Sequence, residues 1–395
     1  MRKKLHRRRS GHMFGRRRRP VGKIVGWVLL LAVAGLAGFG TVSLLRNTPT
    51  PAPSDSAVSG TESGPSASTS PQTSATSQTT IPDTPAPASA RRAAFLPLSR
   101  LRDAAARTAE LDALKQQGYT AVVFDLKGAD GVLHYAFDGE LAAKARTVAE
   151  DAMTAQELSA LLADCAACDM EAIPRLYAFE DAAAPNRLKS ARINWSGDKM
   201  TLWLDAKASN GGKAWLNPYA ADARAYLTEL AVTLKDAGVT ALLFDGVRFP
   251  GSTYEAYFGT EAETADGYAG ALTAFVSEVN AALGSQTELL LCMPLSAALG
   301  TDTAVYGGNP LTFGADTVCP VIDKAALTAF AQSLTEGEAS QAAPASSKEL
   351  LSRALASVTT RLGFVQGEKP EVLPWVTAEL ADALPGGSAC MVTAE

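Results

Sequence analysis

The chain has 395 residues, with 36 basic and 41 acidic side chains and a formal net charge of −5. Of the basic residues, 12 lie within residues 1–46, where no acidic residue occurs, so the remaining chain carries 24 basic against 41 acidic residues. An acidic body of this kind is repelled by phosphate backbones, which excludes nucleic acid as an expected partner. The length allows one large domain with additional segments.

The basic residues at the amino terminus precede a long apolar segment. Residues 20–45 contain a single charged residue, and about 20 apolar residues are enough to cross the hydrocarbon core of a bilayer. Ten Lys and Arg residues come before this segment, so the positive-inside rule predicts that the amino terminus faces the cytoplasm. The sequence therefore predicts a basic cytoplasmic tail over 1–20, an uncleaved transmembrane helix over 21–45 and a body outside the cell membrane. A cleaved signal peptide is the alternative, because small residues such as Ala37 can serve a peptidase.

A segment rich in Ser, Thr, Pro, Ala, Gly and Gln follows. Between residues 47 and 90 there are three acidic residues and no aromatic residue. Such a composition cannot bury enough apolar area to offset the entropy lost on ordering, so residues 46–91 are predicted to form a disordered linker. This linker would hold the body, residues 92–395, away from the membrane.

The few Cys and His residues argue against a metal site and against a disulfide framework. Cys165 and Cys168 form a C-x-x-C pair within a predicted helix, with no second pair and no His nearby. The other three Cys residues lie in apolar runs, where Cys behaves as a small core residue. No metal and no cofactor is expected. A metal-dependent hydrolase is excluded because the body contains a single His, His134.

From residue 91 onward, apolar runs alternate with helical patterns. The predicted strands are 93–98, 119–126, 171–178, 239–246, 288–294, 315–322, 371–377 and 388–393. The predicted helices are 103–117, 154–168, 219–237, 264–283, 323–334 and 346–362. Eight strands alternating with helices over about 300 residues predict a (β/α)8 TIM-type barrel. A doubly wound sheet is the alternative, but no Gly-rich phosphate-binding turn supports it.

Charged residues stand at the ends of several predicted strands. The fourth run ends in Asp245 and is followed by Arg248, and the second run ends in Asp125 and Lys127. Parallel barrels build their sites at the carboxyl ends of the strands and in the loops that follow them. These side chains, together with Asp205 in the loop after the third strand, are therefore expected to share one mouth of the barrel. A structural Asp–Arg pair that pins a loop is the alternative interpretation of Asp245 and Arg248.

The third strand and the long loop after it add polar and aromatic candidates. These are Arg175 in the strand and Trp203, Asp205, Trp215, Asn217 and Tyr219 in the loop. Carboxylates, amides and aromatic faces together suit a sugar, whose hydroxyl groups form hydrogen bonds while its C–H face packs on an aromatic ring. Asn217 followed by Pro218 is also typical of a helix start. We therefore expect Asn217 to cap the next helix while Trp215 faces the cleft.

Five segments in this order resemble a known family. They are 124–131 (FDLKGADG), 173–181 (IPRLYAFED), 203–205 (WLD), 215–219 (WLNPY) and 244–250 (FDGVRFP). Together they are similar to the putative glycosyl hydrolase domain family of bacterial surface proteins, over about residues 93–395. The resemblance implies a TIM barrel, distantly related to α-amylase-like glycosidases, that acts on a carbohydrate in the cell envelope.

The resemblance also implies roles for individual residues. Asp245 would occupy the fourth-strand position where amylase-like relatives keep their nucleophile, with Arg248 as its charged partner. Asp125 and Asp205 match the other acidic positions of the family. The remaining candidates are expected to bind the substrate: Lys127, Arg175, Trp203, Trp215, Asn217 and Tyr219.

Two departures from the family pattern leave catalysis open. Gly246 stands where the family has an aromatic residue, and the fifth strand runs into residues 292–296 (CMPLS) where the family has an acidic motif. Glycoside hydrolysis ordinarily needs two carboxyl groups, so another acidic residue must replace the missing one. Asp181 and Asp302 are further candidates for that acid.

The expected function is hydrolysis of a cell-envelope or other extracellular polysaccharide by a membrane-anchored barrel. Asp245 would be the nucleophile or charge stabiliser, kept ionised by Arg248, and Asp205 or Asp125 would protonate the leaving oxygen. The alternative is a carbohydrate-binding or scaffold barrel that has lost its acid.

Overall fold

The structure is a computed structural model that describes residues 91–336, 346–384 and 388–393. The predicted basic tail (1–20) and transmembrane helix (21–45), and the predicted linker up to residue 90, lie outside the described residues and stay predictions. Within the described part of the chain, no helix combines the length and the apolar character that crossing a bilayer requires.

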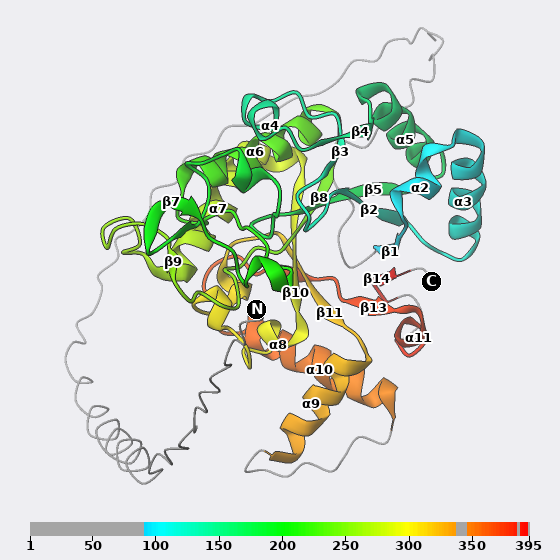
Figure 1. The fold of residues 1–395 in the computed structure, drawn as a ribbon. Helices are drawn as coiled ribbons and strands as arrows, with labels where there is room; N and C mark the ends of the chain where they lie inside the picture. Colours follow the sequence, from blue (N-terminus) through cyan, green and yellow to red (C-terminus); the bar gives the residue numbers. More distant parts are fainter. Residues whose placement is uncertain (1–90, 337–345, 385–387, 394–395) are drawn as a thin grey trace, which may run out of the picture. The chain divides into compact units, whose positions relative to one another are not determined.

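Eight parallel strands close into a barrel, with helices packed around its outside (Figure 1). The strands are β1 (Arg92–Phe95), β2 (Ala121–Lys127), β5 (Glu171–Tyr177), β8 (Ala241–Asp245), β10 (Glu288–Pro294), β11 (Thr317–Ile322), β13 (Trp375–Thr377) and β14 (Cys390–Thr393). Each strand pairs in parallel with the next one in this order, and β14 pairs with β1 to complete the ring. All eight predicted strands are present, and the predicted (β/α)8 architecture is confirmed over the described residues.

The six predicted helices are also present. They are α3 (Ala104–Gln116), α5 (Ala155–Ala167), α6 (Ala221–Asp236), α7 (Gly267–Leu283), α9 (Lys324–Glu336) and α10 (Ser347–Leu362). Four shorter helices accompany them: α2 (Leu98–Arg102), α4 (Glu140–Ala145), α8 (Leu295–Ala298) and α11 (Ala378–Ala381). Side chains mark the starts of several helices. Thr154 and Glu157, for example, form a reciprocal capping box at the start of α5.

The predicted cap at Asn217 is wrong. Helix α6 begins four residues later, at Ala221, and no side chain caps it. The Asn217 Oδ1 atom instead accepts the backbone N–H of Tyr219 at 3.2 Å, and the Asn217 carbonyl accepts the N–H of Ala220. Asn217 therefore organises a turn before the helix, because Asn side chains bond their own backbone two residues on.

Alternation along the strands separates two apolar layers. On β2, Val122 and Phe124 pack into the large core shared with the helices, whereas Ala121 and Val123 point into the barrel. The barrel interior is filled by side chains from most of the eight strands, among them Ile173. Both faces of each strand are therefore apolar, which explains why the strands are continuous apolar runs in the sequence.

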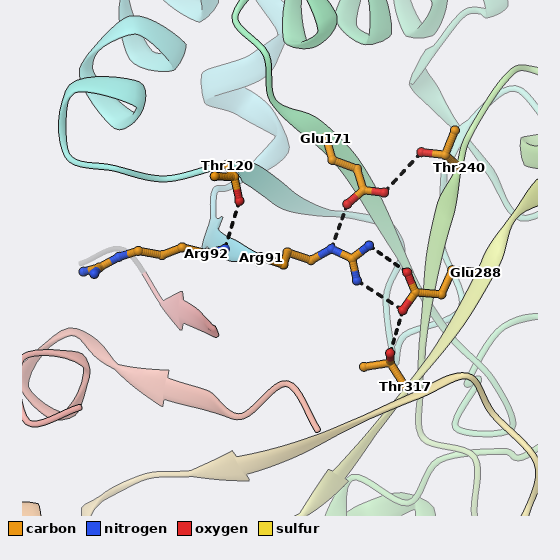
Figure 2. Close-up of polar contacts among 7 residues, drawn as sticks. All are labelled: Arg91, Arg92, Thr120, Glu171, Thr240, Glu288 and Thr317. Atoms are coloured by element: carbon orange, nitrogen blue, oxygen red, sulfur yellow. Dashed lines mark hydrogen bonds and ion pairs between the residues drawn. The ribbon is translucent and has the colours of Figure 1, made fainter. Parts of the chain in front are cut away.

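A buried arginine closes the amino end of the barrel (Figure 2). Arg91 is 1% exposed. Its guanidinium donates to Glu171 at 2.7 Å and to Glu288 at 2.7 and 3.2 Å. The hydroxyl groups of Thr240 and Thr317 donate to the same two carboxylates. Glu171 and Glu288 are the first residues of β5 and β10, so this network ties strand starts together at the end opposite to the candidate site.

Two insertions follow strand ends on the other side of the barrel. The first, after β2, contains β3 (Leu133–Tyr135), α4 and β4 (Val148–Met153). The second, after β5, contains β6 (Asn194–Trp195) and β7 (Asp198–Leu202). Together with β9 (Ala256–Tyr257), from the segment after β8, strands β6 and β7 form a three-stranded sheet in the order β7–β6–β9, with antiparallel pairs.

Candidate active site

Three charged residues from adjacent strands meet at the carboxyl end of the barrel. Asp125, Arg175 and Asp245 lie on β2, β5 and β8, which are neighbours in the sheet. The Arg175 guanidinium donates to both carboxylate oxygens of Asp125, at 2.6 and 3.0 Å. It also donates to Asp245 Oδ2 at 3.3 Å. The structure thus brings Asp125, Arg175 and Asp245 together, with Arg175 between the two acids.

Arg175 is held by rings as well as by charges. Its guanidinium carbon lies 5.0, 4.9 and 4.8 Å from the ring centroids of Phe95, Tyr177 and Trp375, distances typical of cation–π contacts. Burial tends to lower the pKa of Arg175, but the hydrogen bonds and charge of Asp125 outweigh this effect and raise the pKa above its usual value. Arg175 is therefore a permanent positive charge between the two acids.

Asp245 has further polar neighbours. Its Oδ1 accepts the N–H of Gly246 at 2.7 Å, and Gly246 has a φ of +64°, a conformation that glycine adopts without strain. Burial and then the charge of Asp245 raise the pKa of the Cys292 thiol and of the Tyr177 hydroxyl. The thiol and the hydroxyl therefore both stay neutral near pH 7.

Asp245 also lines a cavity of about 550 Å³ at the ends of β10 and β11, beside α8 and α9. The lining is mostly apolar, with polar side chains from Ser296, Thr301 and Ser333 and a second carboxylate, Asp323. A concave, mainly apolar space with a few polar groups is the usual form of a small-ligand site. The cavity therefore identifies Asp245 as the member of the charged trio that faces space for a ligand.

The analysis of the sequence missed Asp323. It directly follows β11, the sixth barrel strand, in the segment 319–327 (CPVIDKAAL), and a strand-end position was the signal that could have identified it. Its Oδ1 accepts the N–H of Ala326 at 2.7 Å and so caps the start of α9. The side chain is exposed, which leaves it accessible from the cavity.

The expected pairing of Asp245 with Arg248 is wrong. Arg248 donates to Glu180 Oε2 at 2.8 Å, and its guanidinium lies 4.9 Å from the ring centroid of Trp215. The ion partner of Asp245 is Arg175. Arg248 lies three residues beyond Asp245, after the turn at Gly246, and the turn directs it to another loop.

Asp205 does not line the cavity. Its Oδ1 accepts the N–H of Lys213 at 2.7 Å, and its Oδ2 accepts the indole N–H of Trp215 at 3.0 Å. Both oxygens thus organise the long loop after β5. The Trp215 ring lies between Asp205, which accepts its N–H, and the Arg248 guanidinium.

The expectation that Trp215 faces the cleft is wrong, and Trp203 is likewise not available for stacking. Each is 3% exposed, and the two rings pack with Ile193 in a separate small core. The indole N–H of Trp203 donates to the Tyr254 carbonyl at 2.8 Å. Sequence spacing cannot distinguish a buried loop core from an exposed stacking surface, because both need large aromatic rings.

Tyr219 and Asn217 also have packing roles. Tyr219 is half-buried, within 6.2 Å of the rings of Phe249, Phe258 and Tyr268 measured between centroids. Asn217 is buried and donates from Nδ2 to the Phe258 carbonyl at 2.7 Å. These contacts join the loop after β5 to the segment after β8.

The expectation that Lys127 binds substrate is not supported, because its side chain is 0% exposed. Its Nζ forms an ion pair with Asp181 at 2.9 Å and donates to the carbonyls of Tyr177 at 2.6 Å and Ala178 at 3.4 Å. Asp181, one of the alternative acids, is equally buried and accepts two backbone N–H groups. The pair fastens the end of β2 to the end of β5.

Across the residues that the structure describes, no group of three or more His, Cys, Asp or Glu side chains is arranged to hold a metal ion.

Comparison with solved structures finds several similar chains. One is a hypothetical protein of Ruminiclostridium thermocellum, with 19% identity, a TM-score of 0.43, and coverage of 50% of this chain and 95% of that one. Another is an exo-β-N-acetylglucosaminidase of Vibrio harveyi in complex with N-acetylglucosamine, with 10% identity, a TM-score of 0.43, and coverage of 62% and 40%. A third is a cycloisomaltooligosaccharide glucanotransferase of Paenibacillus sp., with 12% identity, a TM-score of 0.44, and coverage of 73% and 38%.

These similarities are too low to transfer residue roles or activities, and the chain spans less than half the length of the last two proteins. No curated protein matches the chain. The model of one protein family does match, over residues 93–298, with the description of a putative glycosyl hydrolase domain. The matched region runs from β1 to α8 and includes Asp125, Arg175 and Asp245. Since the match covers more than half of the 395 residues, the chain belongs to the putative glycosyl hydrolase domain family.

Proposed function

We propose that this protein hydrolyses glycosidic bonds of a polysaccharide at the cavity beside Asp245. The observation that carries the proposal is the position of Asp245, which ends a barrel strand, borders a cavity of about 550 Å³ and is bonded to the permanent cation Arg175. A carboxylate at this position can stabilise or attack the cationic centre that develops at the sugar's anomeric carbon. Family membership supports the same reaction class.

Asp245 would act as the nucleophile or base, and Asp323 would donate the proton. In the nucleophilic version, an Asp245 oxygen bonds to the anomeric carbon while the glycosidic C–O bond breaks, and the Asp323 proton passes to the leaving oxygen. Water then cleaves the glycosyl ester and returns a proton to Asp323. Asp125 is a poorer donor, because both of its oxygens already accept hydrogen bonds from the Arg175 guanidinium.

A carbohydrate-binding barrel without turnover is the second candidate function. The observation that favours it is that each candidate acid already accepts hydrogen bonds within the protein. Asp125 accepts two from Arg175, Asp205 accepts two N–H groups, and Asp323 caps a helix. A barrel that lacks a free acid can still bind a glycan in the cavity. Measurement of turnover separates the two functions.

The proposed location is outside the cell membrane, with residues 21–45 as the anchor and 46–91 as the linker. The support is the basic tail that precedes the apolar segment. Protease added to intact cells should release a soluble body by cutting within residues 47–90. A body that stays protected until the cells are lysed would contradict this orientation.

Turnover is tested on soluble polysaccharides, including xylan, pullulan, laminarin and solubilised peptidoglycan, with the release of reducing ends as the signal. Asp245→Asn should lower turnover by about 10²–10³-fold, because it removes the charge at the reacting centre. Asp236→Asn is the matched control, since Asp236 is exposed at the far end of α6. Equal turnover of Asp245→Asn and wild type would refute the assignment.

A further inference from the structure

Exposed apolar side chains gather on one small part of the molecule. In the part of the chain that the structure describes, five large apolar side chains are exposed: Val148, Trp195, Met200, Tyr254 and Phe364. Three of these belong to the small sheet of β6, β7 and β9: Trp195 lies on β6, Met200 lies on β7, and Tyr254 stands two residues before β9. We infer that this set, named here the small-sheet surface, is a binding platform for a glycan chain.

The ring of Trp195 is fixed in place although 38% of the residue is exposed. Its indole N–H donates to Glu255 Oε2 at 2.9 Å. The ring lies directly against Gly197, where an added Cβ would come within 2.5 Å of the Cη2 and Cζ2 atoms. The backbone N–H of Ser196 also donates to the Glu255 carbonyl. An exposed ring that is already oriented loses little conformational entropy when a ligand packs on it.

Tyr254 is anchored through its backbone and free at its side chain. Its carbonyl accepts the indole N–H of the buried Trp203 at 2.8 Å, while 77% of Tyr254 is exposed. Met200, 81% exposed, lies on β7, the strand that pairs with β6. These exposed side chains thus rest on ordered backbone, which distinguishes them from side chains scattered singly over a surface.

Buried side chains connect the small sheet to the mouth of the barrel. Trp203 shares its small core with Trp215, and the Trp215 ring lies under the Arg248 guanidinium. Arg248 in turn pairs with Glu180, which follows β5. The sheet is built from the segments after β5 and β8, the strands that carry Arg175 and Asp245, so it belongs to the loops at the carboxyl end of the barrel.

The chemistry of the surface suits a sugar polymer. Aromatic faces accept the C–H face of a pyranose ring. Carboxylates lie beside them: Glu255 Oε2 accepts the Trp195 indole N–H, and Asp198 Oδ2 accepts the Thr201 hydroxyl. A carboxylate can accept further hydrogen bonds from sugar hydroxyl groups. That the ligand is a glycan rests on the proposed function. The residues to which this inference assigns binding do not line the cavity. Stacking is thus assigned to Trp195 and Tyr254, since the buried Trp203 and Trp215 cannot provide it.

The test is affinity electrophoresis of the full protein in gels that contain xylan, pullulan, laminarin or solubilised peptidoglycan. Trp195→Ala and Tyr254→Ala should each weaken binding to the retarding polysaccharide about tenfold, the effect of losing one stacking contact of ~1.4 kcal/mol. Phe364→Ala is the matched control, because Phe364 is 76% exposed but lies beyond α10. Gly197→Ala should also weaken binding, since its Cβ displaces the Trp195 ring while the indole is kept.

Three results would overturn the inference. The first is retardation of Trp195→Ala and Tyr254→Ala equal to that of the wild type. The second is no retardation of the wild type by any of the four polysaccharides. The third is a lower oligomer mass of these variants than of the wild type, which would show that a second copy occupies the surface. Failure of the proposed function has a different signature: the Asp245→Asn variant would keep full turnover, while the effects of Trp195→Ala on retardation persist.

Discussion

Replacing Arg91 with Met tests how the barrel is closed at its amino end. The guanidinium is almost fully buried and balances two carboxylates, Glu171 and Glu288, whose side chains are 11% and 10% exposed. Removal of one partner from a buried ion pair costs about 3–5 kcal/mol, because the remaining charge is left unpaired. For a domain of this size the loss corresponds to a fall in melting temperature of about 5–8 °C.

The loss of stability should depend on pH. In the wild type, burial raises the pKa of Glu171 despite the opposing effect of Arg91. A carboxyl group with a raised pKa in the folded state favours folding below its unfolded pKa of 4.5 and loses that contribution as pH rises through the folded pKa. Without Arg91 the pKa of Glu171 should rise further, so the destabilisation should be larger at pH 8 than at pH 5.5.

Urea unfolding followed by far-ultraviolet circular dichroism measures the free energy of unfolding at both pH values. Arg100→Met is the matched control: Arg100 and Glu110 form an exposed pair at 3.4 Å, so its loss should cost less than about 1 kcal/mol. If Arg91→Met costs no more than Arg100→Met at pH 8, the network at the strand starts does not hold the barrel together, and the argument from burial is refuted.

Three further predictions concern the candidate site. Lys127→Met should lower the free energy of unfolding, measured by urea titration, by about 3–5 kcal/mol without changing KM for a polysaccharide. A raised KM at unchanged stability would instead show that Lys127 binds the substrate. Gly246→Ala should cost about 1 kcal/mol, because φ is +64°, and the melting temperature measures this. Asp323→Asn should suppress turnover of polysaccharide more than turnover of an aryl glycoside with a good leaving group; equal suppression of both would remove Asp323 as the acid.

The strands and helices were predictable because their signals are local. The run 239–246 is apolar on both faces, as a buried parallel strand requires, and the structure has β8 there. The seventh strand shows the limit of this signal. Residues 371–377 form two short strands, β12 (Glu371–Val372) and β13, on either side of Pro374, which has no N–H to donate to a ladder.

Partners within the site were less predictable, because they depend on how loops fold back. Asp125 and Asp245 were expected at one mouth from strand direction alone, and both contact Arg175 there. The partner of Arg248 is Glu180, because the turn at Gly246 directs it away from Asp245. A pairing between residues 68 positions apart leaves no trace in local spacing.

Burial in loops was the other quantity that the sequence did not reveal. Trp215 and Trp195 are both aromatic residues of the long loop after β5, yet Trp215 is 3% exposed and Trp195 is 38% exposed. The difference arises from a loop core around Ile193 that forms only when the segments after β5 and β8 pack together. Asp323 was missed for a related reason, since its importance comes from the cavity that it shares with Asp245.

Chemical rescue of Asp245→Ala tests the central claim most directly. The substitution removes the carboxylate and leaves space for a small anion at the anomeric carbon, so sodium azide should restore turnover of an aryl glycoside of the sugar that the wild type releases, with a glycosyl azide as the product. The account predicts turnover near zero without azide and a glycosyl azide detected by mass spectrometry with it. Full turnover of Asp245→Ala without azide, or a loss that azide does not restore, would contradict a role for Asp245 at the reacting carbon.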